Sequence, residues 1–346
     1  MLIGASAPRP ILTHMNDHHP TLRSNGPATP TSRRYLVTGA AGFIGSALAR
    51  RLLDEGATVV GVDAYTTTYD VAEKRARTTS LLRRPRYEHV EGDLVDLPLA
   101  EILDGVETVF HLAGRPGVRP SFELEDLYRH DNVDATRRLL DAAVAAPSVR
   151  RVVYASSSSV YGDAPLPFRE TRPTAPISPY GRTKLEAEEI CLAANGPALE
   201  TVALRYFTVY GPGQRPDMGL RRFAEAALAG QVVELLGDGS QSRDFTYVDD
   251  IVDATRSAAD APAAGLAINV GGGSRITLLG AFDILGELLE RPLDLVFHPF
   301  ARGDVRHTAA DTSRARELLG FEPRVSFAEG YRREVDWLRS RIPVAA

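Results

Sequence analysis

The chain has 346 residues, of which 44% are hydrophobic and 25% are charged. This ordinary globular composition excludes collagen-like, coiled-coil and wholly disordered proteins, and the length allows about two domains. Forty basic and 45 acidic residues give a net charge of −5 without a dense Lys/Arg block, so neither nucleic acid nor an anionic membrane is an expected partner.

The single cysteine, Cys191, excludes an internal disulfide and a thiolate-rich metal site. The sequence contains no run of 18 apolar residues for a membrane span and no signal peptide pattern. We therefore expect a cytoplasmic protein without a bound metal, whose partner is a small molecule.

Residues 1–33 are rich in Pro, Ser, Thr and Asn, which predicts a flexible extension; we assign no metal site to its His18–His19 pair. Residues 35–39 then predict a strand and 43–56 a helix that ends on a glycine. A long polar stretch follows the next strand and predicts no element. The further strands are predicted at 58–63, 86–93, 107–114, 151–158 and 199–207, with a helix over 124–146. This alternation predicts an α/β fold with a doubly wound parallel sheet covered on both faces.

The Pro- and Gly-rich residues 211–219 (GPGQRPDMG) predict a domain seam. Before it we expect a dinucleotide-binding domain over 34–210, and after it a smaller, mixed α/β substrate domain over 211–342. Segments near 244–272 are expected to return to the first domain. Elements of the second half are predicted at 220–230 (helix), 232–236 (strand), 266–272 (strand), 314–320 (helix) and 327–340 (helix).

The turn after the first strand reads TGAAGFIG and has the spacing of a phosphate-binding loop. Gly39 permits a tight turn, Gly42 lets the backbone approach a pyrophosphate, and Gly45 allows close packing of the helix. Asp63 ends the second strand, where a carboxylate binds ribose hydroxyls and repels a 2′-phosphate, so NAD is preferred over NADP. Asp93 is a candidate contact of the adenine amino group or, alternatively, a helix N-cap.

Tyr180 and Lys184, in PYGRTK, share one face if their segment is helical. A phenol acts as a base near pH 7 only if its pKa falls from about 10 to about 7, a change of roughly 4 kcal/mol. Lys184 and an oxidised nicotinamide are expected to supply the positive charge. The serines of ASSSSVYG, residues 156–159, offer a hydroxyl that relays a proton, and spacing alone does not choose among them. No nucleophile elbow accompanies them, which argues against a hydrolase.

Together, TGAAGFIG, ASSSSVYG and PYGRTK resemble the extended short-chain dehydrogenase/reductase family, in its branch of nucleotide-sugar epimerases and dehydratases, over residues 34–340. The resemblance implies a Rossmann-type domain that binds NAD and a C-terminal domain that holds a nucleotide diphosphate sugar. It also implies a homodimer formed through a four-helix bundle, for which the helical segments 123–146 and 178–194 are the candidates.

The same resemblance assigns roles to individual residues. Ser157 is the expected catalytic hydroxyl and Ser159 supports the substrate, while Tyr180 is the base and Lys184 binds the nicotinamide ribose. The remaining cofactor-binding residues are then Phe43, Ile44, Leu112, Ala113, Gly114 and Asn132, the last also supporting the active-site helix.

Dehydratases of the family carry an Asp-Glu pair where this chain has Ser158 and Ser159, so dehydration is not expected. The run LRYFTVYGPGQRPDMGL instead resembles the uronic acid 4-epimerases, which implies that Thr208 and Arg215 face a sugar carboxylate. A guanidinium fork matches a carboxylate, although a surface arginine at a domain seam is the plainer interpretation of Arg215.

Two further segments carry expected substrate contacts. Arg243, in GDGSQSRDFTYVDD, is expected to bind the nucleotide phosphates, and Asp304, in ARGDVRHTAAD, the uridine end. Here the chain departs from the family, because Ala301 stands where an arginine is usual and Arg302 follows it; the role of Arg302 is therefore open.

We therefore expect a UDP-sugar 4-epimerase that interconverts UDP-glucuronate and UDP-galacturonate through a 4-keto intermediate, with NAD retained and recycled. The alternatives are an epimerase of UDP-glucose or UDP-N-acetylglucosamine, a decarboxylase of UDP-glucuronate, and a non-enzymatic dinucleotide-binding protein.

Overall fold

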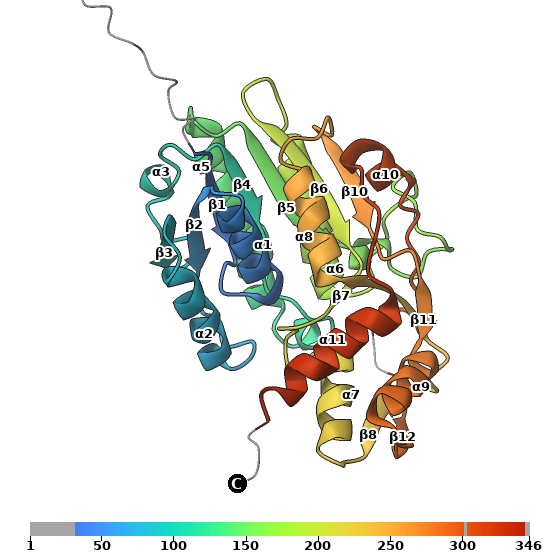
Figure 1. Ribbon diagram of the computed structural model, residues 1–346. Helices are drawn as coiled ribbons and strands as arrows, with labels where there is room; N and C mark the ends of the chain where they lie inside the picture. Colours follow the sequence, from blue (N-terminus) through green and yellow to red (C-terminus); the bar gives the residue numbers. More distant parts are fainter. Residues whose placement is uncertain (1–31, 301–302, 343–346) are drawn as a thin grey trace, which may run out of the picture. The chain divides into compact units, whose positions relative to one another are not determined.

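The computed structural model describes residues 32–300 and 303–342 (Figure 1). The His18–His19 pair, Arg302 and all but the last two residues of the predicted extension 1–33 lie outside the described residues. Arg33, at the end of that range, donates a hydrogen bond from its guanidinium to Asp260 at 2.7 Å.

A seven-stranded parallel sheet forms the centre of the described chain, and this confirms the predicted doubly wound fold. Its order is β10-β6-β5-β4-β1-β2-β3, so the chain starts near the middle, moves to one edge and returns to build the other. The strands are β1 (Arg34–Thr38), β2 (Thr58–Asp63), β3 (Tyr87–Glu91), β4 (Thr108–His111), β5 (Arg151–Ser157), β6 (Glu200–Tyr206) and β10 (Leu266–Val270).

Helices cover both faces of this sheet because neighbouring strand residues point to opposite sides. Val37 packs in the same apolar cluster as α1 (Phe43–Asp54) and α8 (Val248–Ser257), whereas Leu36 packs in the cluster of α5 (Ala135–Ala145) and α6 (Pro179–Ala193). The predicted helix 124–146 consists of α4 (Glu125–Arg129), the π-helical turn η2 (His130–Asp134) and α5. The short α3 (Leu99–Ile102) precedes β4.

The polar stretch after β2 contains a helix, α2 (Val71–Leu82), which the sequence pattern did not predict. Its N-terminus is capped by Asp70, whose carboxylate accepts a hydrogen bond from the backbone N–H of Ala72 at 2.8 Å. Its buried residues are Lys74, Thr78 and Leu81. Because two of these three are polar, apolar periodicity does not reveal the helix.

The second half forms two small sheets and three helices around the carboxyl end of the large sheet, and a fourth helix, α10 (Ser313–Leu319), that packs against β10 and α8 (Figure 1). One sheet has the order β11-β9-β7, and the other pairs β12 with β8. Their strands are β7 (Thr208–Tyr210), β8 (Val233–Leu236), β9 (Ser242–Tyr247), β11 (Arg275–Thr277) and β12 (Leu295–His298). The helices are α7 (Gly219–Leu228), α9 (Leu278–Leu289), α10 (Ser313–Leu319) and α11 (Phe327–Arg339).

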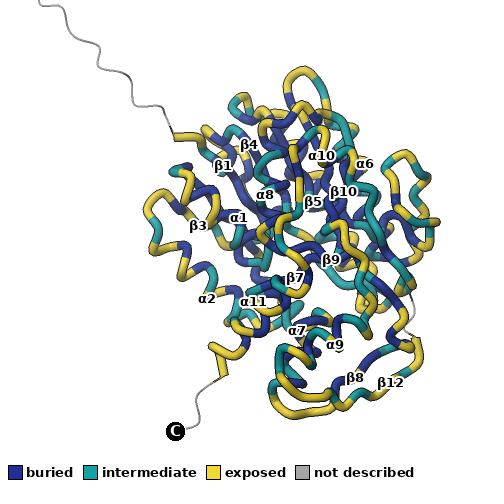
Figure 2. The backbone as a smooth tube through the Cα atoms, turned by 45° about the vertical axis from the view of Figure 1, so that its right-hand side comes forward, coloured by how far each residue is buried: buried dark blue, intermediate teal, exposed yellow. Residues whose placement is uncertain are grey.

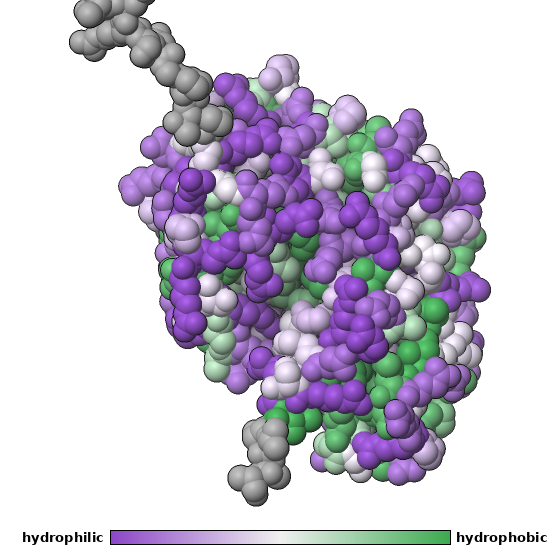
Figure 3. Space-filling view, viewed as in Figure 1, coloured by the Kyte–Doolittle hydropathy of each residue, from purple (hydrophilic) through white to green (hydrophobic). Residues whose placement is uncertain are grey.

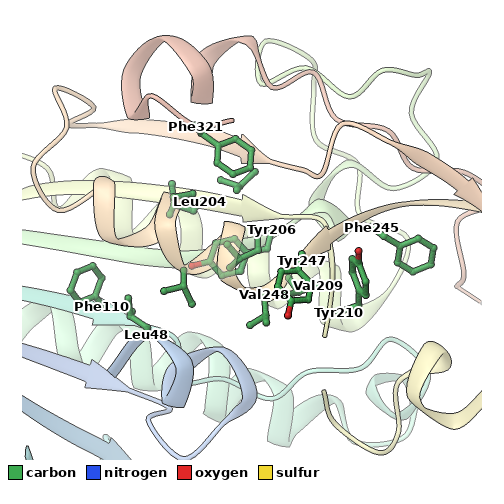
Figure 4. Packing of buried hydrophobic residues seen from close by; sticks show 14 of the residues in the cluster. Leu48, Phe110, Leu204, Tyr206, Val209, Tyr210, Phe245, Tyr247, Val248 and Phe321 are labelled. Carbon is green, nitrogen blue, oxygen red and sulfur yellow. The ribbon is translucent and has the colours of Figure 1, made fainter. Parts of the chain in front are cut away.

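One apolar cluster continues from the large sheet into the second half (Figure 4). It runs from Leu48 on α1 and Phe110 on β4, through Tyr206 on β6, to Tyr210 and Phe245 in the small sheet. In Figure 2 the buried residues gather in the strands of the large sheet, and the loops at the periphery are mostly exposed. In the view of Figure 3 the surface is mainly hydrophilic, and apolar side chains gather over α9. Among the described helices, none is long and apolar enough to cross a bilayer.

The packing of the first turn gives a stability prediction. A Cβ on Gly45 would lie 2.1 Å from the carbonyl oxygen of Gly39, so the helix or the turn must move. We expect Gly45→Ala to lower the free energy of unfolding by about 2 kcal/mol, measured by urea unfolding followed by circular dichroism. Gly196→Ala is the control, because a Cβ on Gly196 would have no atom within 4 Å of it. Equal losses for both variants would contradict the prediction.

Candidate functional site

A cavity of about 960 Å³ lies where the large sheet meets the second half of the chain. All the predicted site residues line it, although they come from segments spread along the chain. They are Gly39, Gly42, Phe43, Ile44, Gly45, Asp63, Asp93, Leu112, Ala113, Gly114, Asn132, Ser157, Ser159, Tyr180, Lys184, Thr208, Arg215, Arg243 and Asp304.

The glycine turn brings three backbone segments into contact. Gly39 has φ +69°, in the left-handed region, and a Cβ there would lie 2.9 Å from the backbone nitrogen of Ala113. Helix α1 begins directly after Gly42, and no side chain caps its first N–H groups. These N–H groups and the helix dipole therefore remain available to an anion at the cavity wall.

Asp63 is held by the backbone at the end of β2. Its two carboxylate oxygens accept hydrogen bonds from the N–H groups of Ala41 (3.0 Å) and Tyr65 (2.8 Å). An ionised carboxylate has about four acceptor positions, so this fixed group retains capacity for ribose hydroxyls.

Asp93 accepts a hydrogen bond from the N–H of Val95 at 3.0 Å, within a turn. Helix α3 begins only at Leu99, after Pro98. The alternative interpretation of Asp93 as a helix N-cap is therefore wrong.

Helix α6 carries Tyr180 and Lys184 into the cavity on one face. The helix begins at Pro179, and the Ser178 hydroxyl caps it by accepting a hydrogen bond from the N–H of Gly181 at 3.1 Å. Ser157 ends β5 and lines the same cavity; its oxygen accepts a hydrogen bond from the N–H of Ser159 at 3.1 Å.

The expectation that Lys184 and an oxidised nicotinamide together lower the pKa of Tyr180 stays a prediction. Burial raises the pKa of Tyr180 above its ordinary value, and the groups that oppose this are the Ser157 hydroxyl and the Arg215 charge. Lys184 instead donates to the carbonyl of Ala155 at 2.6 Å, and burial lowers its own pKa to about 7. The lysine head thus lies against the backbone of β5.

A buried ion pair beneath the site was not predicted. Arg205 on β6 donates from Nε and a terminal nitrogen to the carboxylate of Glu188 on α6, the shortest contact being 2.6 Å. The Ser156 hydroxyl, next to Ser157, donates to the same carboxylate at 2.5 Å. The pair thus joins α6 to the ends of β5 and β6. The sequence feature that could have indicated this ion pair is Glu188, which follows Lys184 by four residues and therefore lies on the same face of the helix.

Asn132 connects α6 to the loop after β4. Its side-chain oxygen accepts a hydrogen bond from the N–H of Arg115 at 2.6 Å, and its side-chain nitrogen donates to the hydroxyl of Thr183 at 3.0 Å. The π-helical turn η2 presents Asn132 at this position.

The segment 211–219 carries Arg215 into the cavity, yet its guanidinium already holds a carboxylate. Nε donates to one oxygen of Asp217 at 2.9 Å, and a terminal nitrogen donates to the other at 2.8 Å. The sequence did not predict this pairing. Thr208, at the start of β7, lines the cavity as well.

Contacts from both halves of the chain hold this segment. Arg77 on α2 donates to the carbonyl oxygens of Ala41 (3.3 Å), in the glycine turn, and Gly213 (2.9 Å). From the other side, Glu334 on α11 accepts a hydrogen bond from the N–H of Gly211 at 3.1 Å. These contacts were not predicted, because they join residues far apart in the sequence.

Arg243 and Asp304 line the cavity in the second half of the chain, together with Arg119, which the sequence did not single out. Arg119 donates to Asp304 at 3.3 Å. Burial lowers the pKa of Arg243; the Asp304 charge raises it and the Arg119 charge lowers it further. The two arginines thus form a positively charged region suited to an anion.

Residues 35–271 match the sequence profile described as the NAD dependent epimerase/dehydratase family. The chain belongs to this family. A UDP-glucuronate 4-epimerase of Thermodesulfobacterium geofontis is 38% identical over 314 residues, which cover 89% of this chain and 97% of the relative. A UDP-glucose 4-epimerase of Mycolicibacterium smegmatis is also 38% identical, covering 89% and 99%.

Among solved structures, the UDP-glucuronic acid 4-epimerase of Bacillus cereus in complex with UDP-glucuronic acid and NAD is similar to this chain. Its TM-score is 0.86 and its sequence identity 35%, with 89% of this chain and 99% of that chain covered. The extended short-chain dehydrogenase/reductase resemblance and the Rossmann-type fold are thereby confirmed.

The contact between Glu334 and Gly211 gives a prediction on pH. Glu334 is fully buried, and burial raises its pKa to about 8. Between about pH 4.3 and pH 8 the folded state therefore holds a proton that the unfolded state has lost, so stability falls as pH rises through this window. We expect the free energy of unfolding to fall by about 4 kcal/mol more in the wild type than in Glu334→Gln between pH 5 and 8.5.

Urea unfolding at a series of pH values measures this difference. The control is Glu329→Gln, on the same helix, because Glu329 is exposed and its pKa lies below its ordinary value. Parallel pH profiles for the wild type and Glu334→Gln would contradict the prediction.

Proposed function

We propose that the protein is a UDP-sugar 4-epimerase that interconverts UDP-glucuronate and UDP-galacturonate. The observation that carries this proposal is that Arg215, on the loop after β7, lines the same cavity as Tyr180, on α6. The charge of Arg215 opposes the rise in the pKa of the phenol. A guanidinium beside the proposed base suits a sugar whose C6 carboxylate lies next to the reacting C4.

The residues at the glycine turn fit NAD. Gly39 leaves no room for a side chain beside Ala113, the first N–H groups of α1 are uncapped, and Asp63 is fixed with acceptor capacity. Bound NAD supplies an acceptor for hydride from C4 and a donor that returns it. Gly42, Phe43, Ile44, Gly45, Asp93, Leu112, Ala113, Gly114 and Asn132 are the other proposed contacts of the cofactor.

Tyr180 is the proposed base that takes the proton of the C4 hydroxyl, and Ser157 the hydroxyl that relays it. Since burial raises the pKa of Tyr180, positive charge must oppose that effect for the phenolate to form near neutral pH. Arg215 contributes part of this charge. We assign Lys184, held by Ala155, to the nicotinamide ribose.

Thr208 and Arg215 are the proposed contacts of the sugar carboxylate, Ser159 supports the sugar, and Arg243 and Asp304 bind the nucleotide end. After hydride leaves C4, a uronate becomes a β-keto acid, which loses carbon dioxide readily. A carboxylate held by two fixed groups keeps its C–C bond in a geometry that opposes this loss.

The main alternative is a 4-epimerase of UDP-glucose or UDP-N-acetylglucosamine, and a decarboxylase of UDP-glucuronate is the next. Sequence identity does not choose between a uronate and a neutral sugar, because one relative of each kind is 38% identical to this chain. The choice of a uronate therefore depends on Arg215.

A homodimer and a cytoplasmic location remain proposals. Support for the dimer comes from exposed apolar side chains along the helical segments expected in a four-helix bundle. Leu124 and Leu127 are 42% and 44% exposed, and Val144, near the end of α5, is 54% exposed. These side chains would be covered in such a bundle.

Product analysis tests the reaction. Purified protein given UDP-glucuronate without added NAD should yield an isomer of unchanged mass, identified as UDP-galacturonate by NMR. Tyr180→Phe should lower kcat by at least about a hundredfold, because it removes the acid–base group. A product lighter by carbon dioxide would identify a decarboxylase, and turnover of UDP-glucose alone would identify a neutral-sugar epimerase.

Arg215→Met tests the choice of substrate. The variant keeps an apolar stem but loses the charge, so kcat/KM for UDP-glucuronate should fall at least about tenfold more than kcat/KM for UDP-glucose. Arg84→Met is the control, because Arg84 pairs with Asp54 outside the cavity. Equal losses for the two sugars would contradict the carboxylate assignment.

A further inference from the structure

The carboxylate of Asp217 binds the guanidinium of Arg215 in the way expected of a substrate carboxylate. Two parallel hydrogen bonds of 2.9 and 2.8 Å join the two groups in a fork. Both side chains line the cavity. Arg215 is therefore already paired, and a second carboxylate that approaches it meets the negative charge of Asp217.

We propose that Asp217 competes with the sugar carboxylate for Arg215 and thereby sets the preference between uronate and neutral sugars. This inference rests on the proposed function, because it takes Arg215 as the uronate-binding residue. Asp217 pairs with Arg215 when no uronate is bound. The carboxylate of a uronate replaces Asp217 on the guanidinium, whereas a neutral sugar leaves the pair intact.

The exposure of the two side chains supports this exchange. Asp217 is 46% exposed, whereas Arg215 is 17% exposed, so the aspartate has access to water while the arginine stays in the cavity wall. Among the described residues, Arg215 is the only side chain that donates a hydrogen bond to Asp217. Asp217 precedes α7, which begins at Gly219, so its rotation breaks no helical hydrogen bond.

The charges of Asp217 and Arg215 favour their pairing when no uronate is bound. Burial raises the pKa of Asp217, but the hydrogen bonds and charge of Arg215 outweigh it, so the carboxyl remains ionised at neutral pH. Nearby Arg221 is already held by Glu73 at 2.6 Å and Glu225 at 2.7 Å and does not take over Asp217.

An arginine left unpaired in a partly buried site is unfavourable. The return of Asp217 to Arg215 therefore also favours release of a uronate product. A neutral sugar neither gains from Arg215 nor displaces Asp217.

Binding measurements on the NAD-containing protein test the proposal. The background is Tyr180→Phe, in which turnover is blocked, and Asp217→Asn is added to remove the competing charge at constant size. Isothermal titration calorimetry is carried out with UDP-glucuronate, UDP-glucose and UDP. Breaking a half-exposed ion pair changes affinity modestly, so we expect Kd for UDP-glucuronate to fall about fivefold and the other two Kd values to stay within about twofold.

Asp54→Asn in the same background is the matched control, because it also breaks an aspartate–arginine pair but lies outside the cavity. It should leave all three Kd values unchanged. Asp217→Ala is a second variant and should give the same selective gain. Circular dichroism spectra establish that each variant is folded.

Three results would overturn the inference. A selective loss of UDP-glucuronate affinity in Asp217→Asn would mean that Asp217 orients Arg215 rather than competing for it. An equal loss of affinity for all three ligands would mean that Asp217 has a structural role. Equal Kd values before and after the substitution would mean that the Arg215–Asp217 pair does not affect the choice of sugar. Failure of the proposed function is distinct, because the protein with Tyr180 intact would then form no UDP-galacturonate whatever Asp217→Asn does.

Discussion

The buried pair of Glu188 and Arg205 is the constraint on which the proposed reacting groups depend. Burying two charges is costly, and removing one partner of such a pair destabilises a protein by about 3–5 kcal/mol. Here the pair fixes α6 against β5 and β6, with the Ser156 hydroxyl on the same carboxylate. Tyr180 and Lys184 lie two turns and one turn before Glu188 on that helix, so their positions relative to Ser157 follow from it.

A second constraint acts on segment 211–219, which lies between the two halves of the chain. Arg77 connects it to the glycine turn, and Glu334 holds its first N–H group from the last helix. The proposed sugar-binding end of the cavity is thus joined by hydrogen bonds to the proposed cofactor-binding end. A change at the glycine turn therefore reaches Arg215 through two hydrogen bonds of one arginine.

The sequence predicts most of the large sheet because its strands are apolar runs buried on both faces, and it predicts the glycine turn because spacing constrains a tight turn before a helix. Helix α2 was missed because it buries Lys74 and Thr78. Every predicted site residue lines the cavity. Most of the motifs follow the carboxyl ends of parallel strands, and these ends lie at one edge of the sheet. The Arg215–Asp217 pair was missed because sequence periodicity does not show where the side chains of a loop point. The contact between Glu334 and Gly211 was missed because the two residues lie 123 positions apart in the sequence.

The position of β10 has a consequence during synthesis on the ribosome. It is the edge strand that pairs with β6, yet the chain forms β7, α7, β8, β9 and α8 between them. Until Leu266–Val270 have emerged, one side of β6 has no parallel partner, and exposed strand edges invite pairing with other chains. While the residues between β6 and β10 are being translated, the nascent chain therefore exposes an edge of β6 that β10 covers in the folded protein.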